Sequence, residues 1–233
     1  MGHAARIAAL AATSALLLAS RAVAQDRLQA FAGGQIDFAS YGFVGATAPL
    51  PGASLGHGLA VRGSAFGGTY DYRGGPANGR VDATFGGAQL DALYQAMGRS
   101  WWFDGGVGAR YIDTHLSPFD RGNRRHGAQV EAAISADGGG VHGPWRVDYY
   151  GSYGTRLDDY AARASLTHAI TDRLRAGGEA SVEGDPTYDL QRVGPYVGFG
   201  LDHWSELQVS AGVSHQSGRD VGGYLRLSAY RSF

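Results

Sequence analysis

Residues 173–183, RLRAGGEASVE, decide the fold class of this chain, because their side chains alternate in character from one residue to the next. One face of an extended strand here would carry Leu174, Ala176, Gly178, Ala180 and Val182, and the other Arg173, Arg175, Gly177, Glu179 and Ser181. Residues 205–215 and 221–233 repeat this period of two. Small or apolar residues opposite polar ones are typical of a membrane barrel, whose wall faces lipid and whose lumen is polar.

The same period predicts about twelve strands along the chain. They are expected at residues 28–38, 41–50, 57–70, 81–95, 101–115, 126–136, 145–153, 160–170, 173–183, 188–201, 206–215 and 221–233. Most have about the ten residues that a tilted strand needs to cross a bilayer. We therefore predict an all-β fold, a transmembrane antiparallel up-and-down β-barrel.

The connections between these strands are predicted to alternate in length. Short turns are expected at residues 39–40, 171–172 and around 202–203, and longer loops at 73–80, 116–125 and 137–144. Short turns at one rim and longer loops at the other are the arrangement of outer-membrane barrels.

Residues 1–24 have the pattern of a secretory signal peptide. Arg6 precedes an apolar run at residues 7–18, and Ala22 and Ala24 provide the small residues of a cleavage site before Gln25. The run is shorter than the roughly 20 residues of a membrane-spanning helix, so cleavage is favoured over an anchor. Residues 25–233 are then expected to form one barrel domain in the outer membrane.

The end of the chain and its composition support export to that membrane. Phe233 closes an amphipathic final strand, a pattern that predicts recognition by the barrel-assembly machinery and insertion into outer-membrane lipid. The chain has no cysteine, so a closed hydrogen-bonded sheet rather than disulfides is expected to stabilise it. Its net charge of −1 argues against nucleic acid as a partner.

A water-soluble periplasmic barrel or β-sandwich is the structural alternative. It would show the same period of two, but its core would need large, closely packed apolar side chains. Here the less polar face is often only alanine, glycine, valine or leucine, which favours the membrane barrel.

Aromatic residues occur in groups that suggest a girdle or a binding track. The candidates are Tyr70, Tyr72, Trp101, Trp102, Tyr149 and Tyr153. Girdles at the two membrane interfaces are the favoured interpretation. A track that stacks on the sugar rings of a glucan is the alternative.

Charged residues at strand positions are candidates for the lumen. They include Arg110, Glu131, Arg163, Glu179 and Arg226. If these side chains point inward they would pair across the lumen and narrow it, so structural salt bridges are the favoured interpretation.

The sequence predicts no catalytic, cofactor-binding or metal-binding residue. His115 and Ser117 would share a strand face with Asp113, an arrangement that a lipid hydrolase needs, but Pro118 follows and suggests a loop without fixed geometry. The histidines are scattered and show no metal-binding spacing.

Several segments resemble the cellulose biosynthesis protein BcsS family. They are THLSPFDRGN at residues 114–123 with Gly127, GSYGT at 151–155 with DYAAR at 159–163, Tyr188 with VGP at 193–195, YGFVG at 41–45, and YDY at 70–72. The resemblance spans most of the chain after the signal peptide.

The resemblance implies a non-enzymatic outer-membrane barrel that is accessory to bacterial cellulose production or export. Its expected partners are cellulose or cellulose-secretion components, with no cofactor. An outer-membrane lipid hydrolase and a small-solute channel are the alternatives.

Overall fold

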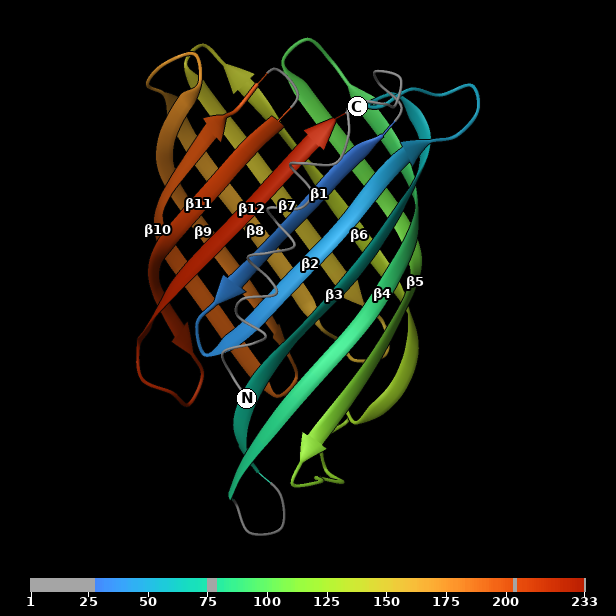
Figure 1. Ribbon diagram of the computed structural model, residues 1–233, viewed down its shortest axis with the longest axis vertical. Helices are drawn as coiled ribbons and strands as arrows, with labels where there is room; N and C mark the ends of the chain where they lie inside the picture. The colour runs from blue at the N-terminus through green and yellow to red at the C-terminus, as the bar shows by residue number, and fades with distance from the viewer. Residues whose placement is uncertain (1–27, 75–78, 203–204, 233) are drawn as a thin grey trace.

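The computed structural model describes residues 28–74, 79–202 and 205–232. They form a closed barrel of twelve strands (Figure 1). The strands are β1 (Gln29–Ile36), β2 (Ala39–Pro49), β3 (Gly58–Gly74), β4 (Gly79–Met97), β5 (Trp101–Ser117), β6 (Gly127–His142), β7 (Trp145–Gly154), β8 (Tyr160–Ala169), β9 (Leu174–Asp185), β10 (Tyr188–Gly200), β11 (Ser205–Gln216) and β12 (Gly222–Ser232).

Each strand pairs antiparallel with its neighbours in the sequence, and the first strand closes the barrel on the last. Gln29 lies opposite Ser232, and Ile36 lies opposite Leu225. Closure pairs the backbone groups of what would otherwise be two sheet edges, which is the condition for a sheet to cross a bilayer.

The predicted fold class is confirmed, and each of the twelve predicted strands is present with ends that differ by a few residues. The prediction of a longer loop at residues 137–144 is wrong, because β6 continues to His142. Only Gly143 and Pro144 remain to join β6 to β7, and Gly143 adopts a φ of 58°. Glycine enters this left-handed region without the steric cost of a side chain.

The predicted alternation of short and long connections is also wrong in part. The turn expected at residues 39–40 lies at 37–38, at the rim opposite to the short turn at 170–173. The long connection 50–57 lies at the same rim as that short turn. The loop expected at 116–125 is observed at 118–126.

Four predictions fall wholly or partly outside the described residues. The signal peptide at residues 1–24 and the terminal Phe233 lie outside them, as do parts of the connections at 73–80 and 202–203. Within the described chain, no helix is long and apolar enough to cross a membrane.

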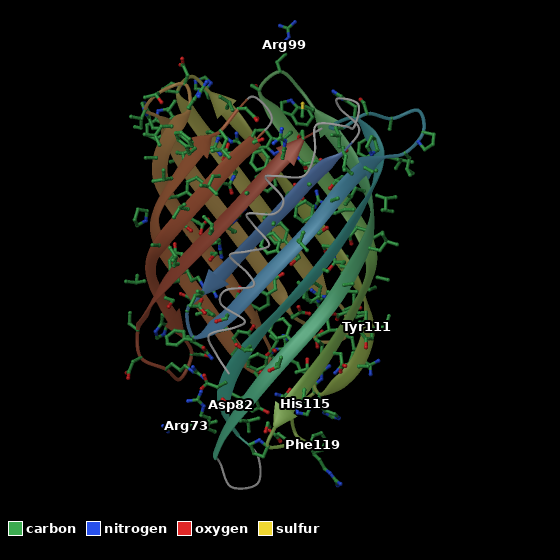
Figure 2. All side chains as sticks on the ribbon, viewed as in Figure 1. Arg73, Asp82, Arg99, Tyr111, His115 and Phe119 are labelled. Carbon is green, nitrogen blue, oxygen red and sulfur yellow. The ribbon has the colours of Figure 1, made fainter. Side chains whose placement is uncertain are left out.

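The barrel has two distinct rims. We call the rim where β1 begins and β12 ends the terminal rim, and the opposite one, which carries loops 118–126, 155–159 and 217–221, the loop rim. In Figure 2, Arg99 marks the terminal rim at the top, whereas His115 and Phe119 mark the loop rim at the bottom. The β3–β4 hairpin extends furthest at the loop rim (Figure 1).

Side chains on the outer wall are mostly apolar, whereas many lumen side chains are charged or polar. Exposed outward residues include Leu90, Val107, Val130, Ile134, Val147, Leu166, Val193, Val197, Val209 and Val213. Buried inward residues include Asp91, Asp104, Glu131, Glu179, Arg192 and Glu206. This distribution is the reverse of a soluble barrel and matches that of membrane barrels.

Candidate functional site in the barrel lumen

The structure divides the candidate aromatic residues between the two faces of the wall. Trp101, Tyr149 and Tyr153 lie on the outer wall and are exposed. Tyr70, Tyr72 and Trp102 have the opposite strand parity and point into the lumen. Trp101 and Trp102 are neighbours in the sequence, but Trp101 faces outward and Trp102 faces the lumen, because successive side chains of a strand point to opposite faces.

The candidate charged residues all lie on the lumen side and form ion pairs with one another. Arg110 on β5 pairs with Glu131 on β6, with an Nη2–Oε1 distance of 2.6 Å. Glu179 on β9 accepts a hydrogen bond of 2.7 Å from Arg226 and lies 3.7 Å from Arg163. Each acid thus has arginine partners, which offsets the cost of removing its charge from water.

Sequence reasoning missed a further arginine that reaches along the lumen. Arg62 on β3 donates hydrogen bonds to Asp104 on β5, at 3.0 Å, and to Asp137 on β6, at 2.6 Å. Its inward position follows from the alternation of β3, where Ala60 is also buried. The alternation therefore predicts that Arg62 faces the lumen, but it does not predict which acids Arg62 pairs with.

Glu131 also fixes the loop between β7 and β8. Its Oε2 accepts hydrogen bonds from the backbone N–H groups of Arg156, at 3.0 Å, and Leu157, at 3.2 Å. Leu157 itself is buried. Asp159 in the same loop pairs with Arg110 at 2.6 Å. Burial raises the pKa of the Asp159 carboxyl above its usual range, and Arg110 opposes that rise.

Side chains from the loops pair with other strands at the loop rim. Arg125 pairs with Asp185 at the end of β9, at 2.6 Å. Arg219 pairs with Asp71 on β3, at 3.1 Å. In addition, the Tyr72 hydroxyl donates a hydrogen bond of 2.9 Å to Asp120. These contacts tie two loops to walls that are distant in the sequence.

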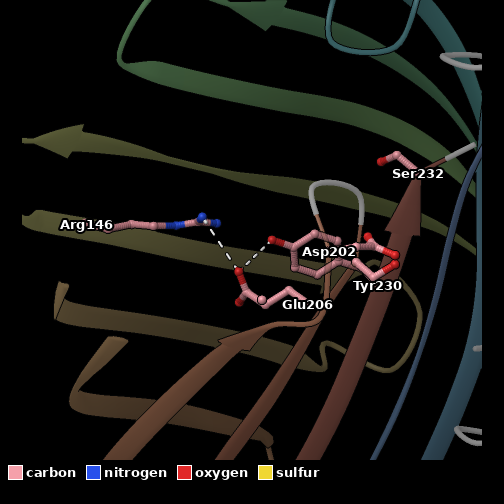
Figure 3. A pocket seen from close by; sticks show the side chains of 7 residues that line it. Arg146, Asp202, Glu206, Tyr230 and Ser232 are labelled. Carbon is pink, nitrogen blue, oxygen red and sulfur yellow. Dashed lines mark hydrogen bonds and ion pairs between the residues drawn. The ribbon is translucent and has the colours of Figure 1, made fainter. Parts of the chain in front are cut away.

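The terminal rim contains an open cavity of about 260 Å³. Glu206 is its central acid: the Tyr230 hydroxyl donates a hydrogen bond of 2.8 Å to Oε2, and Arg146 lies 3.9 Å away (Figure 3). Arg175 pairs with the other carboxylate oxygen. The Arg146 guanidinium lies over the Trp102 ring, 4.6 Å from its centroid. The cavity thus combines paired charges with aromatic surface.

A row of inward aromatic rings connects the two rims. We call it the aromatic ladder and define it, in spatial order, as Phe31, Phe43, Tyr41, Phe85, Tyr70 and Tyr72. Successive ring centroids are 6.3, 5.8, 6.3, 6.0 and 6.2 Å apart. Sequence reasoning selected only Tyr70 and Tyr72, because the others are separated by glycines and do not form clusters along the chain.

The hydrolase candidates lie on the outer wall. Asp113, His115 and Ser117 are all exposed and have the outward parity of β5. No hydrogen bond joins them among the described residues, and none of those residues form a group of three or more His, Asp or Glu side chains that could hold a metal ion. The arrangement lacks the base-to-hydroxyl contact of nucleophilic catalysis.

The closed wall, apolar outside and charged inside, defines the class of protein as a β-barrel of the outer-membrane type. The model of the family described as "Cellulose biosynthesis protein BcsS" matches residues 29–233, and the chain belongs to that family. This confirms the resemblance seen in the sequence. No curated protein sequence matches the chain.

Solved structures show the same fold at low sequence identity. The KdgM porin is 9% identical, with a TM-score of 0.51 over 88% of this chain and 99% of that one. The translocator domain of the autotransporter NalP from Neisseria meningitidis is 14% identical, with a TM-score of 0.52 over 99% of this chain and 97% of that one. At these identities the likeness concerns the fold alone.

Proposed function

We propose that this chain is an integral outer-membrane barrel that assists cellulose export without catalysing a reaction. The observation that carries the proposal is the combination, in a BcsS family member, of an apolar outer wall with a lumen of paired charges and aromatic rings. Membership of the family supports a role in cellulose production, and the apolar outer wall supports a location in the membrane.

The outer wall supports insertion into lipid. Exposed apolar side chains such as Val107, Ile134 and Leu166 lie near the middle of their strands. Trp101 and Trp145 are exposed beside the terminal rim, where aromatic rings suit the depth of the lipid headgroups. Outer-membrane lipid and the barrel-assembly machinery are then the expected partners, and the terminal rim faces the periplasm.

The lumen supports a role in handling a polymer more than free passage of small solutes. Arg62 joins two other strands across part of the interior, and Arg125 and Arg219 tie loops over one rim. The KdgM porin, which has a similar barrel, has been solved in complex with disordered oligogalacturonate. A barrel of this fold can therefore associate with a sugar oligomer.

Deletion and rescue test the proposal in a cellulose-producing Gram-negative strain. We expect deletion of the gene to lower secreted cellulose, measured by dye binding and by glucose released with cellulase. Full-length protein should restore it and should migrate in the outer-membrane fraction with a shift on boiling. Unchanged cellulose after deletion, or a protein in the soluble fraction, would contradict the proposal.

A further inference from the structure

We propose that the aromatic ladder is a binding track for a linear, uncharged β-glucan chain. This inference deepens the proposed function and rests on it. It concerns where the polymer contacts this barrel and which chemistry recognises it.

The register of β1 to β4 forces the ladder rings into the lumen. Phe31 lies opposite Gly45, and Phe43 lies opposite Gly33, so each ring crosses onto a glycine of the neighbouring strand. A β-carbon on Gly45 would come within 2.4 Å of Phe31, and one on Gly33 within 2.6 Å of Phe43. The rings therefore lie close against the wall, and these two glycines are needed for that approach.

The ladder rings retain accessible surface in the lumen. None of the six is buried, and Tyr41 at the centre is 36% exposed. Two inward tyrosines on the other wall are packed instead, with Tyr196 only 3% and Tyr224 only 5% exposed. Space filling accounts for Tyr196 and Tyr224, but it leaves the open surface of the ladder without a role.

Two inward tyrosines have hydroxyls without a hydrogen-bond partner among the described residues. Tyr150 on β7 points inward, as its pairing with Arg163 shows, and is 37% exposed. Tyr41 lies on β2, close to half-way around the barrel from β7. Neither hydroxyl has a hydrogen bond to any residue that the structure describes. They can donate to or accept from the hydroxyls of a sugar chain between them.

Charge pairing in the lumen favours a neutral ligand. Arg62 lies 5.9 Å from the Phe31 centroid but is paired with Asp104 and Asp137. Arg226, next to the ladder through its bonds to Gln35, is paired with Glu179. An acidic polysaccharide would have to displace these carboxylates, whereas a neutral glucan needs only ring faces for its C–H surfaces and polar groups for its hydroxyls.

Binding of cello-oligosaccharides to the full-length protein in detergent tests the track. By isothermal titration we expect affinity to rise from cellobiose to cellohexaose, because a longer chain contacts more rings, and oligogalacturonate to bind more weakly. This series uses the unaltered protein and so does not depend on the folding of a variant. No cello-oligosaccharide binding, or equal binding of oligogalacturonate, would overturn the proposal.

Substitutions locate the site. We expect Tyr41→Leu and Phe43→Leu to weaken cellohexaose binding about tenfold each, and Tyr41→Phe to weaken it less, since the ring remains. Tyr149→Leu and Tyr153→Leu, on the outer wall, are the matched controls and should bind like the wild type. Each variant is used only if it shows the wild-type shift on boiling. Equal losses of cellohexaose affinity in the two control variants would show that the sugar does not bind at the aromatic ladder.

The track and the proposed function can fail separately. If deletion lowers cellulose but the pure barrel binds no cello-oligosaccharide, the track is wrong and the export role stands. If the barrel binds cellohexaose through Tyr41 but deletion leaves cellulose unchanged, the track stands and the export role is wrong.

Discussion

The Arg125 guanidinium lies 2.6 Å from the Asp185 carboxylate, and this pair joins the β5–β6 loop to the end of β9. Two strands, β7 and β8, separate this loop from β9 around the barrel. The Asp185 side chain is only 5% exposed, so the bond forms inside the rim rather than at its surface. The loop is thereby fixed to the inner side of the wall at β9.

Breaking this pair is predicted to open the loop rim. Asp185→Asn removes the charge but keeps an oxygen for the bonds that Asp185 accepts from Thr187. We expect higher single-channel conductance in planar bilayers than for the wild type. Asp158→Asn, which alters the exposed pair with Arg124, is the control and should leave conductance unchanged. Equal conductance of the wild type and Asp185→Asn would show that the Arg125–Asp185 pair does not limit the passage of ions through the barrel.

Removing Glu131 is predicted to destabilise the barrel. Glu131→Ala removes one of the two acids paired with Arg110, the other being Asp159, and frees two backbone N–H groups of the β7–β8 loop. We expect the free energy of unfolding to fall by about 1–3 kcal/mol, the usual cost of leaving a buried donor without its acceptor, since Arg110 keeps Asp159 as a partner. Guanidinium unfolding in lipid vesicles, followed by tryptophan fluorescence, measures this loss.

Asp82→Ala is the control for that measurement. The Arg80–Asp82 pair is 70% and 65% exposed, so its loss should leave the free energy of unfolding almost unchanged. If Glu131→Ala costs no more than Asp82→Ala, the lumen around Arg110 is hydrated and the pair contributes little.

An arginine on the outer wall is predicted to cost stability according to its depth. Val107→Arg places a charge near the middle of β5 and should lower the free energy of unfolding by about 2–4 kcal/mol, as at a bilayer midplane. Thr84→Arg places the same charge near the loop rim, opposite His115, and should cost about 0–1 kcal/mol. Equal costs at the two depths would argue that this wall does not face lipid.

Substitution of His115 is predicted to leave membrane lipids unchanged. His115, Asp113 and Ser117 are exposed on the outer wall without a mutual hydrogen bond in the described structure. Mass spectrometry of phospholipid and lipid A should give the same profile for cells with the wild type, with His115→Ala and without the protein. A lysophospholipid that appears with the wild type and disappears with His115→Ala would establish the hydrolase instead.

The one large error in the predicted connections has a physical cause. Gly138, Gly139 and Gly140 suggest a loop, yet they continue β6 and pair with β5. A β-carbon on Gly139 would come within 2.4 Å of the Trp102 ring, and one on Gly138 within 2.5 Å of the Tyr149 hydroxyl. These glycines therefore accommodate aromatic side chains from the neighbouring strands. From the sequence alone, such a glycine run cannot be distinguished from a loop, because the ring that packs on it is not known.

The sequence by itself determined the strands and, for the late strands, the face that each side chain occupies. A period of two is a local property, and Glu179 and Arg226 fall on the polar face by counting alone. Composition and motif spacing also indicated the class of barrel and its family.

Only the tertiary structure decided which lumen side chains meet. Arg62 bonds to Asp137, 75 residues away, and Arg226 bonds to Gln35, 191 residues away. The aromatic ladder likewise joins rings from β1, β2, β3 and β4. The register between strands and the closure of β1 on β12 set the height of each side chain in the lumen. A local period fixes the direction of a side chain but carries no information about that height.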